Sequence, residues 1–167
     1  MKTSLASLIR RLITLETENQ NKMPTTLSVD SQIKDSVIPQ LEDRPFFQGM
    51  QNMDLLVYAM ARGFHGQMEL ELKKRNDGGY VRTEQLKDGS PAKALAYSAL
   101  FSKSDFKEPE TLLNARELCL LMERYANGGF QLLDGDLQQG MTDDEMANRC
   151  IADMDELYEE YFGQQVE

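Results

Sequence analysis

The sequence predicts a mainly α-helical fold: a compact domain of five to six helices with a small β-hairpin. Three observations lead to this prediction. Apolar residues recur at intervals of three and four, helix-starting and helix-ending residues flank these stretches, and one segment rich in charge and glycine interrupts them. The chain has 167 residues, of which 41% are hydrophobic. A chain of this length can bury roughly 70% of its unfolded surface in a single core.

The first 26 residues are expected to form a unit separate from the single helical domain at 27–167. Residues 4–16 have the spacing of an amphipathic helix, and a polar linker follows them. This helix either packs on its own domain or acts as a hook for a partner. Its apolar face consists of Leu5, Leu8, Ile9, Leu12 and Ile13.

Two helices and a strand are expected next along the chain. The run from Thr25 to Val29 favours a short β-strand, and a polar cap then starts a brief helix that Pro39 stops or bends. A stronger helix runs from about Met50 to Arg62, and Gly63 is its expected C-terminal stop.

The middle of the chain predicts a β-hairpin. Residues 76–79 read Asn-Asp-Gly-Gly, which is a strong turn signal. The flanking segments, Met68–Leu72 and Tyr80–Arg82, alternate apolar and polar residues and are the two expected strands. As an alternative, Gln67–Leu70 extends the preceding helix.

The second half contains three further helices. Ser90 and Pro91 have the cap and first-position chemistry of a helix start. The helix at Thr111–Ala126 is apolar over most of its circumference and is therefore expected at the centre of the domain. The Asn-Gly-Gly sequence at 127–129 is its expected end, and a turn is expected at 134–136.

The last helix is expected to begin at Thr142, with Glu145 completing a capping box. Its carboxylates from Asp153 to Glu160 are placed mostly on the outer side. The expected inner stripe consists of Met146, Cys150, Ile151, Met154, Leu157, Tyr158 and Tyr161.

The charge of the chain is concentrated at its C-terminal end. Residues 134–167 contain eleven carboxylates and one cation, Arg149, which gives −10, the same as the net charge of the whole chain. Such a surface repels nucleic acid and attracts basic protein surfaces, so we expect a docking surface. The alternative is that the acids only solubilise an exposed helix. The acidic partner-binding candidates are Asp143, Asp144, Glu145, Asp153, Glu156 and Glu160, beside the apolar Leu5, Leu8, Ile9 and Leu12.

No set of residues in the sequence indicates catalysis, so we expect no enzyme, no cofactor and no metal site. His65 is the one histidine, and Cys119 and Cys150 are too far apart to resemble a zinc motif. Both cysteines are expected to be reduced core residues. No segment approaches the ~20 apolar residues of a membrane span, and a cytoplasmic location is expected.

Two alternatives involve nucleic acid. The basic residues Lys73, Lys74, Arg75 and Arg82 surround the predicted hairpin and are weak candidates for phosphate contacts; otherwise they form a solvated turn. The strand at Thr25–Val29 followed by two helices has the element order of a ribbon-helix-helix DNA-binding regulator. A further alternative is an acidic inhibitor that mimics DNA.

Two stretches carry a family resemblance. Residues 54–66, DLLVYAMARGFHG, and residues 123–130, ERYANGGF, resemble the small accessory proteins of Dnd-type DNA phosphorothioation and related bacterial defence operons. The resemblance covers about Val29 to Leu133. Arg62 departs from the small or apolar residue expected before the glycine. The resemblance implies a helical, non-catalytic component of a machine whose nuclease or ATPase is another chain.

Taken with the missing catalytic residues, the resemblance gives the expected function: an accessory interaction subunit of a multi-protein, DNA-targeting defence complex. It would dock on a larger ATPase or nuclease through its amphipathic and acidic helices. DNA would be contacted at most indirectly, no membrane is involved, and self-association stays open.

Overall fold

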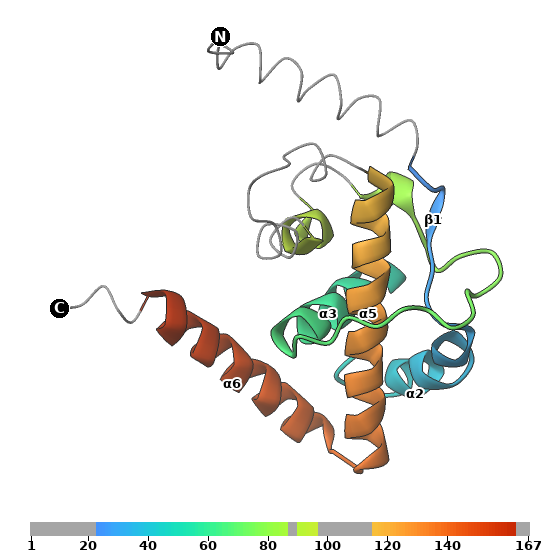
Figure 1. Ribbon diagram of the computed structural model, residues 1–167. Coiled ribbons are helices and arrows are strands. Elements are labelled where there is room, and N and C mark those ends of the chain that lie inside the picture. Colours follow the sequence, from blue (N-terminus) through green and yellow to red (C-terminus); the bar gives the residue numbers. More distant parts are fainter. Residues whose placement is uncertain (1–22, 87–89, 97–114, 163–167) are drawn as a thin grey trace, which may run out of the picture.

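The computed structural model describes residues 23–86, 90–96 and 115–162, with side chains as far as residue 156. These residues form a mainly helical domain with one small antiparallel sheet, which confirms the predicted fold class. The long helix α5 (Ala115–Gln138) is the axis of the domain, and α3 (Asn52–His65) crosses it (Figure 1). The predicted N-terminal helix lies outside the described residues, and the division of the chain after residue 26 stays a prediction.

The sheet consists of β1 (Thr26–Leu27) and β2 (Val81–Arg82). The backbone N–H of Tyr80 donates to the carbonyl of Leu27 at 2.7 Å, beside the paired residues. The second strand of the predicted hairpin is therefore present, but the prediction that it pairs with Met68–Leu72 was wrong. The strand pairs instead with the β-favouring run near residue 26.

Residues 68–71 are not a strand because α5 takes their hydrogen bonds. The N–H of Leu70 donates to the carbonyl of Arg124 at 3.1 Å. The side-chain amide of Asn127 donates to the carbonyls of Leu70 and Glu71, at 3.3 and 3.1 Å. Backbone N–H and C=O groups that already form hydrogen bonds with α5 are not available for pairing with a second strand.

Pro39 does not stop the first helix. A π-helical turn, η1 (Ile33–Val37), leads directly into α2 (Ile38–Glu42), and Pro39 lies in the first turn of α2. The helical segment runs without a break from Ser31 to Glu42, so Pro39 lies inside it, directly after the π-helical turn, where the hydrogen bonds already depart from the α-helical pattern. A short 3-10 turn, η2 (Thr83–Gln85), follows β2.

Glycines at the crossing of α3 and α5 allow the two helices to touch backbone to backbone. A Cβ atom on Gly129 would overlap the carbonyl of Ala59, and one on Gly63 would overlap the carbonyl of Tyr125. A Cβ on Gly128 would overlap the carbonyl of Met68. The predictions that Gly63 ends α3 and that residues 127–129 end α5 were therefore wrong, because these glycines serve close packing inside helices.

The predicted turn at residues 134–136 was also wrong, since α5 continues to Gln138. The predicted start of the last helix is confirmed. The N–H and the hydroxyl of Thr142 both donate to the Glu145 carboxylate, and the Glu145 N–H donates to the Thr142 hydroxyl. These bonds open α6 (Asp143–Phe162).

Residues 91–96 form the remaining described helix. The Ser90 hydroxyl accepts the N–H of Lys93 at 3.3 Å, which confirms the predicted cap. Ala92 and Ala96 are fully buried, so their small side chains place this helix against the core. Among the described residues, no helix combines the length and the apolar character that a bilayer span requires.

The crossing gives a first prediction. Gly129→Ala adds a methyl group against the backbone of α3, which cannot move aside cheaply, and we expect a loss of about 2 kcal/mol in the free energy of unfolding. Gly135→Ala is the matched control, because Gly135 lies in the same helix and a Cβ there would meet no neighbouring part of the protein. This substitution should raise the free energy of unfolding by about 0.5 to 1 kcal/mol. Urea unfolding followed by circular dichroism measures both, and similar values for the two variants would contradict the role of Gly129.

Candidate functional site: the attachment of α6

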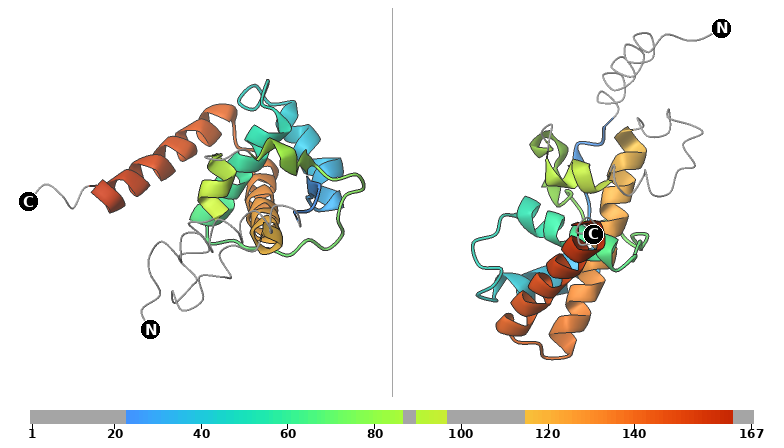
Figure 2. Two further views of the ribbon diagram at one scale, coloured as in Figure 1. Left: turned by 90° about the horizontal axis from the view of Figure 1, so that it is seen from above. Right: turned by 90° about the vertical axis from the view of Figure 1, so that its left-hand side faces the viewer.

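Helix α6 leaves the body of the domain at an angle. Its first turn lies beside the end of α5, and its far end stands away from the other helices in Figure 1 and in the left-hand view of Figure 2. The connection is short: α5 ends at Gln138, Gly140 has a positive φ of 71°, and α6 begins at Asp143. The geometry therefore presents most of one helix to solvent.

The apolar side chains of α6 are only partly used by the domain. Met146 is buried in the core, and Cys150 is half-buried. Ile151 and Met154 are 56% and 64% exposed, so the prediction that they face inward was wrong. The side chains of Leu157, Tyr158 and Tyr161 lie outside the described part of the helix.

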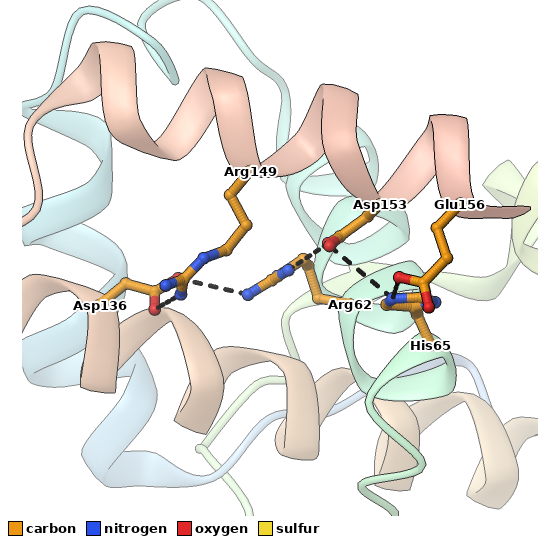
Figure 3. A network of polar contacts seen from close by, with 6 residues as sticks. All are labelled: Arg62, His65, Asp136, Arg149, Asp153 and Glu156. Carbon is orange, nitrogen blue, oxygen red and sulfur yellow. Dashed lines mark hydrogen bonds and ion pairs between the residues drawn. The ribbon is translucent and has the colours of Figure 1, made fainter.

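The inner side of α6 is polar where apolar residues were expected. Its Arg149 forms an ion pair with Asp136 of α5, and its Asp153 forms one with Arg62 of α3 (Figure 3). Arg62 also reaches Asp136, at 3.4 Å. The Asp136 side chain is only 8% exposed and thus joins two cations in a poorly solvated place.

His65 extends this row of polar contacts toward the far end of α6. Its Nε2 atom lies 3.7 Å from Asp153 and 4.0 Å from Glu156. Both residues lie on α6, and His65 is the last residue of α3. The imidazole therefore lies at the C-terminal end of its own helix and also faces two carboxylates of another helix.

A contact between Cys150 of α6 and Tyr58 of α3 lies beside the row. The Cys150 thiol of α6 adjoins the hydroxyl of Tyr58, whose pKa is raised to about 12 chiefly by burial and then by this neighbour. The Tyr58 ring packs edge to face on Phe47, at 5.5 Å between centroids, and on Phe46, at 6.0 Å. The accessibility of the Cys150 thiol therefore depends on how closely α6 lies on α3.

The acidic partner-binding candidates fall into two groups. Asp143 pairs with Arg44 at 3.5 Å, Asp153 pairs with Arg62, and Glu145 caps its own helix. The Thr142 N–H and hydroxyl lower the pKa of Glu145, so it keeps its charge in mild acid. Asp144 and Glu156 are exposed. The side chain of Glu160 lies outside the described residues, as do Leu5, Leu8, Ile9 and Leu12.

The basic candidates do not form one patch. Lys73 and Lys74 are exposed, whereas Arg75 donates to both oxygens of Glu123, at 2.8 and 2.5 Å. This interaction raises the pKa of Arg75. Arg82 pairs with Glu84 at 3.4 Å on the surface. Half of the set is therefore neutralised by acids of the same chain.

The strand that favoured a ribbon-helix-helix interpretation is used inside the domain. One edge of β1 pairs with β2, and on the side of α5 the Ser28 N–H donates to the Glu123 carboxylate at 2.8 Å. Leu27 and Val29 are fully buried. The described strand thus does not offer the exposed edge and face that such a dimer requires.

A pocket of about 380 Å³ lies near the start of α5. Its charged lining residues are the Arg75–Glu123 pair and Arg116. Burial raises the pKa of its Cys119 thiol to about 11, which keeps the thiol neutral. Neutral thiols are poor nucleophiles, and this pocket shows no activated group. The lining residues are Pro24, Arg75, Arg116, Cys119, Leu120 and Glu123.

Within the described part of the chain, no three His, Cys, Asp or Glu side chains are arranged to hold a metal ion. Comparison of the chain with protein-family models, with curated proteins and with solved structures gives no match. The surface of α6 and its attachment are therefore the best-defined candidate site.

Sequence reasoning missed Arg62, Asp136 and Arg149 as parts of this site. One signal was present, since Arg149 is the only cation among the last 34 residues and Arg62 interrupts the apolar pattern of α3. Arg62 and Arg149 are thus exceptions to the local pattern, and each forms an ion pair with a carboxylate of another helix.

A second prediction concerns Asp136. Asp136→Asn leaves Arg62 and Arg149 near each other without the carboxylate between them, and we expect a loss of about 2 kcal/mol in the free energy of unfolding. Asp155→Asn, at an exposed position of α6, should change it by less than about 0.5 kcal/mol. Equal changes in thermal or urea unfolding would show that the polar row does not contribute to stability.

A third prediction concerns the two thiols. The raised pKa leaves almost no Cys119 thiolate at pH 8, and Cys119 is buried, whereas Cys150 is half-buried. Ellman's reagent should therefore react with Cys150 first in the folded chain, and Cys119 should react only after unfolding. Mass spectrometry of the labelled peptides assigns each site; early labelling of Cys119 would contradict its burial.

Proposed function

We propose that this protein is a non-catalytic interaction subunit of a multi-protein bacterial DNA-targeting defence complex. In this proposal α6 docks on a larger ATPase or nuclease. The sequence resemblance supports the choice of complex, and the geometry of α6 supports the mode of interaction.

The observation that carries the docking proposal is the pair of exposed apolar residues on α6. Ile151 and Met154 lie three residues apart on a helix, so they share one face, and both are more than half exposed. Side chains of this kind stabilise an interface when they are buried, by about 1.5 to 3 kcal/mol each. A helix that projects from the domain can lay this face into a groove of another protein.

The negative charge of α6 indicates the charge that a partner surface needs. The helix contains eight carboxylates and one arginine between Asp143 and Phe162. A second copy of α6 would bring like charges together, which disfavours a homodimer through this face. We therefore propose a partner surface with an apolar groove flanked by lysine or arginine, and this complementarity also speeds association at low salt.

A fourth prediction tests this docking surface. Ile151→Ser/Met154→Ser should weaken binding to the ATPase or nuclease encoded beside this protein at least about tenfold, because two buried anchors are lost. Met50→Ser is the matched control, since Met50 is an exposed methionine outside α6. Titration calorimetry with the purified partner, at two salt concentrations, gives the affinities.

A chain that ends at Gln139 should not bind the partner, because it lacks all of α6. Undiminished affinity of this shortened chain, or of the double serine variant, would reject docking through α6.

A further inference from the structure

The polar contacts that hold α6 form a continuous row of arginine, carboxylate and imidazole side chains. In order, the row consists of Arg149, Asp136, Arg62, Asp153, His65 and Glu156 (Figure 3). Three members of the row lie on α6, two on α3 and one on α5, so the row links this helix to the body. After Cys150 in the sequence, the ion pairs between described residues of α6 and the body, those of Asp153 and Glu156, belong to this row.

The start of α6 is fixed separately. Arg44 donates to the carbonyl of Met141 at 2.7 Å and lies 3.5 Å from Asp143. The burial of Met146 in the core adds to this anchor, and the Thr142–Glu145 capping box stabilises the first turn of the helix itself. The first turn is thus attached by several contacts of different kinds, while the far part of the helix is attached by charges.

We propose that the polar row is an electrostatic latch with Asp153 as its exchangeable member. In the free protein Asp153 is bound by Arg62, and in the complex a lysine or arginine of the partner takes its place. The far part of α6 then moves away from α3 about its anchored first turn. This inference rests on the proposed docking function, and it adds how the docking helix is held and released.

Two features of the row support an exchange. The Asp153 and Arg62 side chains are 24% and 13% exposed, so a partner can reach the carboxylate from the solvent side. A basic partner residue gives Asp153 a new counter-charge, and Arg62 keeps its contact with Asp136, so neither member of the broken pair is left without a counter-charge, which would be the costly outcome. Asp136 keeps Arg149 when Asp153 is released, which confines the change to the far part of the helix.

The latch is tested on the full-length chain without any partner. Arg62→Gln should raise the rate at which Ellman's reagent labels Cys150 at least about fivefold, because the thiol lies between α6 and Tyr58. Asp153→Asn breaks the same pair from the other helix and should have the same effect. Arg82→Gln is the matched control, since Arg82 forms an exposed pair with Glu84, and it should leave the rate unchanged.

Hydrogen exchange in α3 and α5 distinguishes release from general loosening. Unchanged protection of these helices together with faster Cys150 labelling supports the latch. An unchanged labelling rate in both variants, or lost protection throughout α5, overturns it.

A basic probe tests the exchange itself. Deca-lysine should accelerate Cys150 labelling of the unmodified protein beyond sodium chloride of the same ionic strength, and should have no further effect on Asp153→Asn. No acceleration by the peptide overturns the exchange. Because these measurements need no partner, failure of the latch leaves the docking proposal standing, and loss of the docking proposal leaves the latch result standing.

Discussion

The domain depends on the close approach of α3 and α5. Helices with ordinary side chains keep their axes 8 to 10 Å apart. Here two glycines, Gly63 and Gly129, remove the intervening side chains at the crossing, and backbone meets backbone. The crossing places Phe130 and Leu133 of α5 and Leu56 and Met60 of α3 in one core, where all four are at most 1% exposed. It also fixes the ends of both helices, and so positions Arg62, His65 and Asp136 for α6.

Much of the fold follows from local patterns in the sequence. The helical class, the central buried helix and the capping box at Thr142 are set by apolar spacing and by hydrogen bonds within one turn, which local reasoning can identify. The errors share a different origin. Gly63 and residues 127–129 have the composition of helix ends, but their role is decided by another helix that lies against them.

The same distinction explains the candidate site. Acidic residues on the last helix were identified from composition, but the inward position of Asp153 depends on Arg62, which lies 91 residues earlier. Apolar periodicity alone would turn Ile151 and Met154 inward, whereas the ion pairs orient the helix differently. Long-range pairing of charges is not encoded in any short segment, so it could not be predicted from one sequence.

The buried Glu123 has a consequence for the order in which the chain can fold. Its carboxylate accepts the N–H of Ser28, 95 residues away, and also binds Arg75, and it is only 2% exposed. On a ribosome, the first strand is made long before this carboxylate emerges. Because it links Ser28 to α5 across a large loop, this hydrogen bond forms only after α5 has been synthesised, whereas the pairing of β1 with β2 needs the chain only as far as Arg82. The packing of Ser28 on α5 is therefore completed after the two strands are already able to pair.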